Sequence, residues 1–185
     1  ERIEPINRKL PGFEKYIIPF DGHTWPPAEH LIQIYIDNSS QATLDFTEVE
    51  QWKGKKKLSN IGCNDKVEWI CFHNRDPAFL NKVYPSRDWS YHDYRNHDID
   101  NFVLAAEELT RRGYYVFRMG VSVEKSFTSN NPKIIDYANS NLRNDFLDVY
   151  LGAKCSFCIS TGLGFDSVPT IFRRPIVLLA NPLGS

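Results

Sequence analysis

The chain has 185 residues, of which 42% are hydrophobic and 24% are charged, and its formal net charge is −1 at pH 7. These values are ordinary for a globular protein with a sizeable core. The near-neutral charge argues against nucleic acid or an anionic membrane as a general partner. The sequence has no apolar run approaching the roughly 18–20 residues of a membrane span, and its charged start predicts no signal peptide.

Residues 1–60 are expected to form an irregular N-terminal extension with one strand and one helix. The apolar run at 31–36 predicts the strand. Thr47 and Glu50 have the T-x-x-E spacing of a capping box, so a helix is expected to follow, although Gly54 weakens it. The run of lysines within that helix is interpreted as a solvated helix end, with an anion-binding patch as the alternative.

From Val67 onward, apolar strand tracts alternate with helical ones. Strands are expected at residues 67–72, 114–119, 133–137, 155–160 and 175–180. A helix between the first two would start at its N-cap Asp98 and stop at Gly113, and a later helix would stop at Gly152. This alternation predicts an α/β fold over residues 61–185, a Rossmann-like parallel sheet with helices on both faces.

Four cysteines and a group of surface aromatics need separate interpretation. Cys155 and Cys158 have C-x-x-C spacing, which suits a redox pair or half a zinc site. They lie within a predicted strand, however, where positions i and i+3 point to opposite faces, so buried free thiols are favoured. Trp89, Tyr91 and Tyr94 fall in a polar loop expected from residue 77 to 97, where a core would not need them.

The sharpest local feature is the polar cluster that begins with His73 at the carboxyl end of the first strand. In open parallel sheets, ligands bind outside the carboxyl ends of the strands. Arg75 offers a rigid fork of donors for phosphate or carboxylate oxygens, and His73 is a candidate general base or hydroxyl contact. The alternative is structural, with Arg75 paired to Asp76. Because Arg118 ends the next strand and Arg95 lies between, we predict a diphosphate ligand.

Weaker candidates follow two other strands. In the turn Ser160-Thr161-Gly162-Leu163-Gly164, the glycines could let backbone amides approach an anion, although such turns often only pack. The turn has neither the NTPase P-loop pattern nor the dinucleotide fingerprint. Asp136, directly before Tyr137, is placed either to accept from a ligand hydroxyl or to cap the next turn, and the sequence does not decide between them.

One acidic pair imitates a metal-binding signature. Asp98 and Asp100 have the D-x-D spacing that binds a metal and diphosphate in some sugar transferases. They coincide with a helix start, where Asp is the expected capping residue. We therefore favour the cap and predict no metal site.

Taken together, these residues resemble a family of bacterial glycosyltransferases encoded with surface-polysaccharide genes. The similarity runs from about Leu44 to the C-terminal end. It rests on Phe46-Thr47-Glu48, Cys71 to Asp76, Tyr94-Arg95-Asn96 before Asp98-Ile99, Arg118-Met119-Gly120, Ile135 to Ala138, and the Ser160-Thr161-Gly162 turn with Pro169 and Phe172 behind it. The order and spacing of these short motifs make the match specific. More remotely, His73-x-Arg75 is similar to the arginine motif of GT-B-type fucosyltransferases.

The resemblance implies a metal-independent GT-B enzyme that needs no cofactor and uses a nucleotide sugar as co-substrate. Arg75 would neutralise the leaving diphosphate with help from Arg118, and His73 and Asp76 would complete the catalytic group. The other substrate-binding residues would be Asn74, Arg95, Gly120, Asp136, Tyr137, Ser160, Thr161 and Gly162. Such enzymes have two Rossmann-like domains. Only one is visible here. Two expectations therefore stay open: the chain is a fragment that contains the donor-binding domain, with its C-terminus as a candidate point of truncation, or its acceptor side is built differently.

The expected partners are a nucleotide-sugar donor, a glycan or lipid-linked acceptor, and a partner domain or second copy of the chain. Nucleic acid is not expected. The expected location is the cytoplasm, with peripheral contact to the inner membrane as an option. Two alternatives stay open. One is a non-catalytic nucleotide- or glycan-binding scaffold of the same fold. The other is a phosphohydrolase using His73 and Asp76, for which the sequence shows no clear nucleophile.

Overall fold

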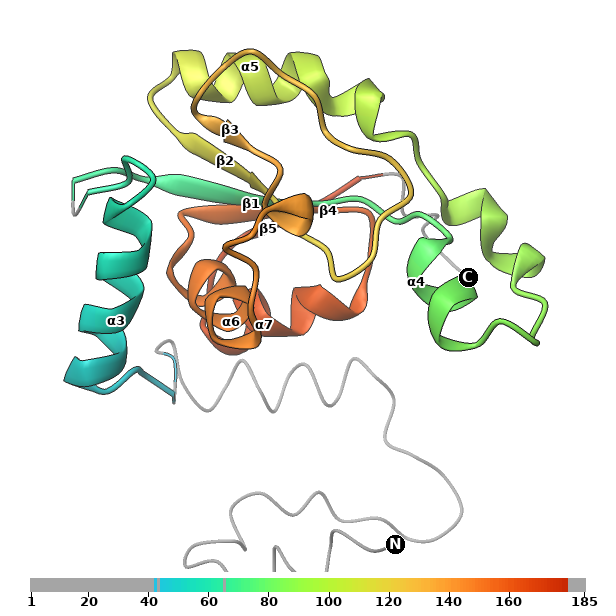
Figure 1. Cartoon of the computed structure of the whole chain (residues 1–185), viewed down its shortest axis with the longest axis horizontal. Helices are drawn as coiled ribbons and strands as arrows, with labels where there is room; N and C mark the ends of the chain where they lie inside the picture. The colour runs from blue at the N-terminus through green and yellow to red at the C-terminus, as the bar shows by residue number, and fades with distance from the viewer. Residues whose placement is uncertain (1–41, 43, 65, 180–185) are drawn as a thin grey trace, which may run out of the picture. The chain divides into compact units, whose positions relative to one another are not determined.

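The computed structural model describes residues 42, 44–64 and 66–179. Within the unit Gln41–Ser185, five strands form one parallel sheet with helices on both faces (Figure 1). The strands are β1 (Trp69–His73), β2 (Tyr115–Arg118), β3 (Ile134–Ile135), β4 (Phe157–Ser160) and β5 (Ile176–Leu178). The predicted parallel α/β architecture is thereby confirmed. The strand predicted at residues 31–36 lies outside the described residues.

The order of the strands creates a natural ligand crevice. Across the sheet the strands lie in the order β3-β2-β1-β4-β5, so the chain first builds outward on one side of β1 and then on the other. Phe72 of β1 is in register with Arg118 of β2 and with Ile159 of β4. The strand order therefore reverses between β1 and β4. Open parallel sheets bind their ligands next to such a reversal, outside the carboxyl ends of the strands.

The helices occupy two layers around the sheet. They are α3 (Glu48–Ser59), α4 (Ala78–Val83), α5 (Val103–Arg111), α6 (Asp145–Lys154) and α7 (Ser167–Ile171), with 3-10 turns η2 (Ser90–Arg95), η3 (Ile99–Phe102), η4 (Tyr137–Asn139) and η5 (Gly164–Asp166). In Figure 1, α5 covers one face of the sheet, and α6 and α7 cover the other. The expected loop from residue 77 to 97 in fact contains α4 and η2. Among the described helices, none is long and apolar enough to cross a membrane.

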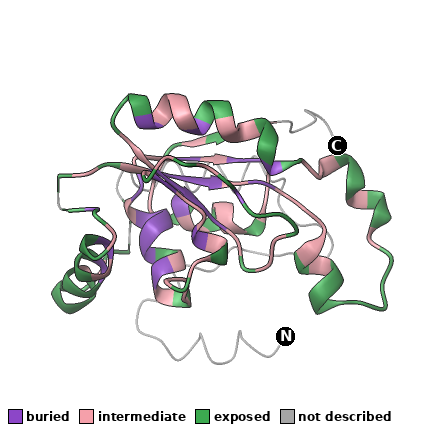
Figure 2. Cartoon of the chain, turned by 45° about the horizontal axis from the view of Figure 1, so that its top comes forward, coloured by how far each residue is buried: buried purple, intermediate pink, exposed green. Residues whose placement is uncertain are grey.

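Two apolar cores result, because side chains along a strand alternate between the faces of the sheet. On the α5 face, Ile70 and Phe72 pack with Val116. On the α6 face, Cys71 and Phe117 pack with residues of α6 and α3. Figure 2 shows the buried residues concentrated in the strands and in the helices beneath them. The four cysteines are buried and free, as predicted. The strand interpretation of the C-x-x-C pair was wrong, however. Helix α6 runs to Lys154 with Cys155 as its C-cap, and β4 begins only at Phe157. Cys155 and Cys158 lie in the same core, on the α6 face of the sheet.

Helix α3 starts with the predicted capping box. Thr47 Oγ1 accepts from the Glu50 amide at 3.3 Å, and the Glu50 carboxylate accepts from the Thr47 amide at 2.8 Å. Gly54 lies against the ring of Tyr150 in α6, where a Cβ would come within 2.3 Å of a ring carbon. The glycine that weakens the helix therefore lets α3 dock on α6. This helix, which the sequence places in the N-terminal extension, belongs to the same core as the sheet.

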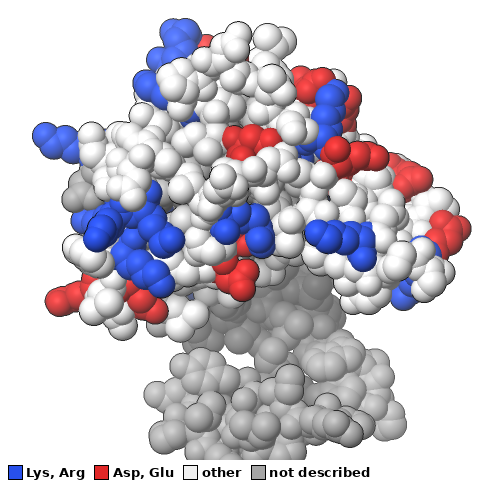
Figure 3. Space-filling view, viewed as in Figure 1, with Lys and Arg blue, Asp and Glu red and all other residues white. Residues whose placement is uncertain are grey.

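The lysines of α3 form a basic surface patch. Lys56 and Lys57 occupy the last turn, where cations complement the helix dipole. Lys53 Nζ lies 4.8 Å from the Phe146 ring centroid, and Lys56 Nζ lies 4.7 Å from that of Trp52. Figure 3 shows basic side chains gathered over this helix. The position of Lys56 and Lys57 in the last turn agrees with the interpretation as a helix end.

Candidate functional site

The carboxyl ends of the strands border a cavity of about 460 Å³ at the reversal in strand order. Its lining residues come from the end of β1, from the segments that follow β1, β2 and β4, and from α6: His73, Asn74, Arg75, Asp76, Phe79, Leu80, Met119, Gly120, Val121, Ser122, Val123, Asp148, Leu163, Gly164 and Phe165. Apolar walls with a few convergent polar groups are typical of small-molecule sites, and the volume falls within their range. We refer to it as the β1/β4 cavity.

Hydrogen bonds connect the end of β1, the turn after β4 and Arg95, which the sequence predicted to lie close together. The Arg75 amide donates to Thr161 Oγ1 at 2.9 Å, and the Thr161 amide donates to the His73 carbonyl at 3.2 Å. Arg95 Nη2 donates to the Gly162 carbonyl at 2.5 Å. The φ of +82° at Gly162 favours glycine in this turn. The ends of β1 and β4 and the Arg95 side chain therefore form one connected group.

Arg75 is the cation that lines the β1/β4 cavity. Its side chain is partly buried, and within the described ranges its Nε is buried without a hydrogen-bond partner. Burial lowers the pKa of the guanidinium, and the positive charge of Arg95 lowers this pKa further. A partly desolvated guanidinium favours an anionic ligand that can accept its donors.

His73 lines the same cavity on the α6 side. Its ring meets the Phe165 ring edge-on, with 5.4 Å between the centroids. Burial, and then the positive charge of Arg118, lower the pKa of the imidazole to about 4. The ring is therefore neutral at pH 7, and a neutral imidazole has one acceptor and one donor nitrogen. It can contact a hydroxyl or accept its proton, although its low pKa makes it a weaker base than free histidine.

Arg118, the other strand-end arginine, has a different environment from Arg75. It is fully buried, and its Nη1 donates to Asp136 Oδ1 and to the Lys125 carbonyl, both at 3.2 Å. Its Nη2 lies 3.6 Å from Asp76 Oδ2. This guanidinium neutralises two carboxylates of the fold. Its predicted assistance to a leaving diphosphate stays a prediction, but its charge is already balanced inside the protein.

The two carboxylates around Arg118 are also held by backbone amides. Asp76 accepts from the Ala78 amide at 3.0 Å and from the Glu124 amide at 3.1 Å. Asp136 accepts from the Phe127 amide at 2.9 Å. These contacts tie the loop after β2 to the end of β1. Neither carboxylate lies free beside a reacting group, so the geometry lends no support to a phosphohydrolase built on Asp76.

Asn74, Gly120 and Tyr137, also predicted to bind substrate, have different positions. Asn74 and Gly120 line the β1/β4 cavity. Asn74 Nδ2 donates to the His97 carbonyl at 3.0 Å, and its Oδ1 has no partner among the described residues. Tyr137 lies in the core instead: its hydroxyl donates to Asp148 Oδ1 at 2.8 Å, and burial raises its pKa. Its side chain therefore supports the fold beneath the site.

Backbone amides of the turn after β4 are largely used within the fold. The Gly162 amide donates to Ser160 Oγ at 3.1 Å, and the Leu163 amide donates to Asp166 at 2.9 Å. Ser160 and Thr161 are buried. The predicted role of these amides towards an anion stays a prediction. The side of this loop that faces the cavity is formed by Leu163, Gly164 and Phe165. The sequence did not single out Phe165, because no periodic pattern marks it.

The D-x-D pair is a helix cap. Asp98 accepts from the Asp100 amide at 3.0 Å, which confirms the cap interpretation. Both carboxylates also contact Lys125 Nζ, at 3.2 Å from Asp98 Oδ1. Within the described ranges, no group of three or more His, Cys, Asp or Glu side chains is arranged to hold a metal ion.

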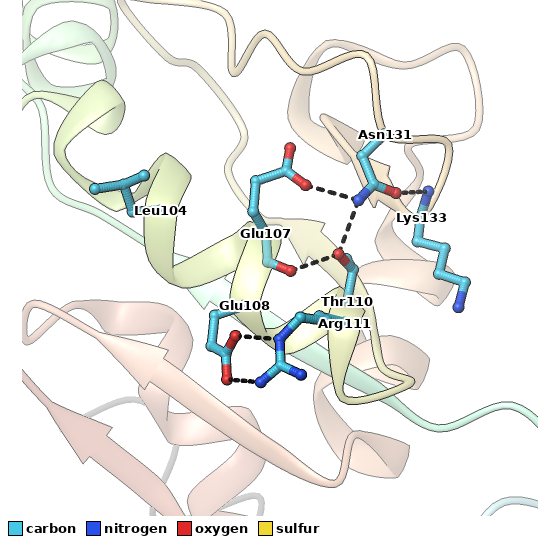
Figure 4. A pocket seen from close by; sticks show the side chains of 7 residues that line it. All are labelled: Leu104, Glu107, Glu108, Thr110, Arg111, Asn131 and Lys133. Carbon is cyan, nitrogen blue, oxygen red and sulfur yellow. Dashed lines mark hydrogen bonds and ion pairs between the residues drawn. The ribbon is translucent and has the colours of Figure 1, made fainter.

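A larger hollow of about 610 Å³ lies on the outer side of α5 (Figure 4). Its polar groups pair with one another. Glu107 accepts from the Asn131 side chain at 2.7 Å, and Glu108 pairs with Arg111 at 2.7 Å. Since these groups already have partners, the hollow is a weaker candidate than the β1/β4 cavity.

Comparisons of the chain with family models, with curated proteins and with solved structures find no match. The resemblance to glycosyltransferases therefore stays a prediction. Function has to be inferred from the cavity and its charges.

Proposed function

We propose that this chain binds a nucleotide sugar in the β1/β4 cavity and transfers its sugar to a glycan acceptor. One observation carries the proposal. At the reversal in strand order, Arg75 lines the cavity with a partly buried guanidinium, while the neighbouring carboxylate of Asp76 is committed to Arg118. A diphosphate is a natural partner for such a cation, because its oxygens match the guanidinium fork.

The expected chemistry is displacement at the anomeric carbon of the sugar. Negative charge then grows on the departing diphosphate, and a preorganised cation stabilises it in the transition state. Arg75 is the residue assigned to this charge, and Arg95 adds positive potential beside it. Neutral His73 is assigned to the acceptor hydroxyl, either as a hydrogen-bond partner or as the group that takes its proton.

A second candidate is a binding module of the same fold without catalysis. It is favoured by the low pKa of His73 and by the full engagement of Asp76, which together leave a weak general base. Turnover separates the two functions. A transferase consumes the donor faster when a glycan acceptor is present, whereas a binding module leaves donor and acceptor unchanged.

The first test is nucleotide binding, measured as a thermal shift with GDP, UDP, CMP and dTDP. One of the diphosphates should stabilise the wild type, by about 1.4 kcal/mol at ten times its dissociation constant. Arg75→Ala should lose this shift. Arg111→Ala is the matched control, because that arginine lies on the outer side of α5 and should keep it. No shift of the folded wild type with any nucleotide, or an unchanged shift in Arg75→Ala, contradicts the proposal.

A further inference from the structure

A second cavity, of about 290 Å³, lies between α4 and η2. Its lining is mainly polar and charged, and includes Asn81, Arg87, Asp88 and Asp93. Arg75 lines this cavity as well as the β1/β4 cavity, as does Leu80 of α4. The two cavities are therefore neighbours, with α4 between them. We refer to the smaller one as the α4/η2 cavity.

Aromatic rings gather around Trp89, which lines the α4/η2 cavity. The ring centroids of Tyr84, Tyr91 and His92 lie 5.9, 6.0 and 6.1 Å from that of Trp89. Arg87 Cζ lies 4.4 Å from the Trp89 ring centroid. Tyr84 and Tyr91 are more than half exposed, at 53% and 56%. In the described part of the chain, Trp89 Nε1 is buried and has no hydrogen-bond partner.

Core packing does not explain this group, because α4 and η2 contain no buried residue. The combination of residues matches the chemistry of a sugar ring. A pyranose has an apolar C–H face, which packs against an aromatic ring, and hydroxyls along its edge, which both donate and accept hydrogen bonds. Carboxylates, amides and a guanidinium supply the matching acceptors and donors, and Tyr and Trp provide rigid rings with an apolar body and a polar tip.

We propose that the α4/η2 cavity binds a sugar unit of the acceptor glycan, beside the donor in the β1/β4 cavity. That this sugar belongs to the acceptor rests on the proposed function, whereas the binding of a sugar in this cavity does not. A nucleobase is the competing occupant of an aromatic site. The polar lining favours the sugar, because the apolar walls of the β1/β4 cavity suit a nucleoside better than this cavity does.

The test observes the indole N–H of Trp89 directly by ¹H–¹⁵N NMR of the whole chain. The protein has four tryptophans, and the Trp89 resonance is identified by its loss in Trp89→Phe. The probes are methyl glycosides of glucose, galactose, rhamnose, N-acetylglucosamine and N-acetylgalactosamine, each titrated to about 50 mM, which would nearly saturate a site with a low-millimolar dissociation constant. The nucleoside diphosphates are titrated in parallel.

At least one glycoside should shift the Trp89 indole resonance in a saturable way. Trp89→Ala should weaken binding of that glycoside at least tenfold and leave the nucleotide affinity unchanged. Trp52→Ala is the matched control, because that exposed tryptophan lies on α3, and it should bind both ligands normally.

Two results would overturn the inference. One is the absence of any glycoside-dependent shift of the Trp89 resonance. The other is a Trp89→Ala protein that loses the nucleotide, which would make the rings a platform for the base. If glycosides bind through Trp89 but no nucleotide binds the wild type, this inference holds and the proposed transferase function fails.

Discussion

Arg75 and Arg118 follow or end neighbouring strands of one sheet, yet the protein uses them differently. Arg118 is fully buried between Asp76 and Asp136, whose charges it balances. Arg75 lines two cavities and is only partly buried, whereas Arg118 borders a cavity of about 280 Å³ but is itself fully buried. The contrast teaches that an arginine at a strand end is a ligand candidate only when the carboxylates around it have another partner. Here Arg118 takes Asp76 and thereby leaves Arg75 available.

The largest expected effect tests whether Arg118 is required for stability. Arg118→Met would leave Asp76 and Asp136 buried without their cation, and breaking a buried pair costs about 3–5 kcal/mol. Unfolding by denaturant measures the loss, and Arg118→Lys, which keeps the charge, should recover part of it. Arg75→Met should change the free energy of unfolding by about 1 kcal/mol or less. Equal losses for Arg75→Met and Arg118→Met would contradict the distinction.

The next effect concerns His73, which lines the β1/β4 cavity together with Arg75. Its pKa in the folded protein is about 4, below the ordinary 6.5 that applies on unfolding. The unfolded chain therefore binds the proton first, and the contribution of His73 to stability falls as the pH drops from about 6.5 to 4. The loss is at most about 3 kcal/mol. The free energies of unfolding of the wild type and of His73→Gln, measured with denaturant at each pH, differ by the contribution of His73. If this difference does not change between pH 6.5 and pH 4, the prediction is contradicted.

The smallest expected effect concerns Lys125, which links the buried ion pairs of Arg118 to exposed carboxylates. We call Arg118, Asp76 and Asp136 the Arg118 cluster. Arg118 contacts the backbone carbonyl of Lys125, whereas the Lys125 side chain reaches the exposed Asp98 and Asp100. Exposed ion pairs contribute little to stability. Lys125→Ala should therefore leave the denaturant midpoint within experimental error of the wild type. A clear decrease would show that the exposed carboxylates take part in the cluster.

Most of the fold was predictable, because its signals are local. Strands show as apolar runs, the helical segment before β2 (η3 followed by α5) has its cap at Asp98, and Gly113, with a φ of +105°, follows the end of α5. The helix α4 and the turn η2 were missed, since they bury no residue and so have no apolar periodicity. The docking of α3 on α6 could not be predicted either, because Gly54 and Tyr150 are far apart in the sequence.

The sequence predicted that the site lies at the carboxyl ends of the strands, but it did not predict how the side chains there are paired. Topology brings His73, Arg75 and the turn after β4 together, but the sequence does not show which polar groups already have partners. Arg118 lies two residues after Val116 on β2, so it shares the face of the α5 core, whereas His73 shares the opposite face with Cys71. The pairing of Arg118 with Asp76 joins two segments that are distant in the chain. No local pattern reveals that pair.

The hydrogen bond from the Glu124 amide to Asp76 has a consequence for affinity. It tethers the segment Val121–Val123, which forms one wall of the β1/β4 cavity. The wall is further confined at Gly120, where a Cβ would come within 2.7 Å of Val123. A ligand therefore meets a wall that is already ordered and avoids an entropy cost of about 0.5–1.5 kcal/mol for each side chain it would otherwise immobilise. Loosening this anchor would weaken binding without removing a single ligand contact.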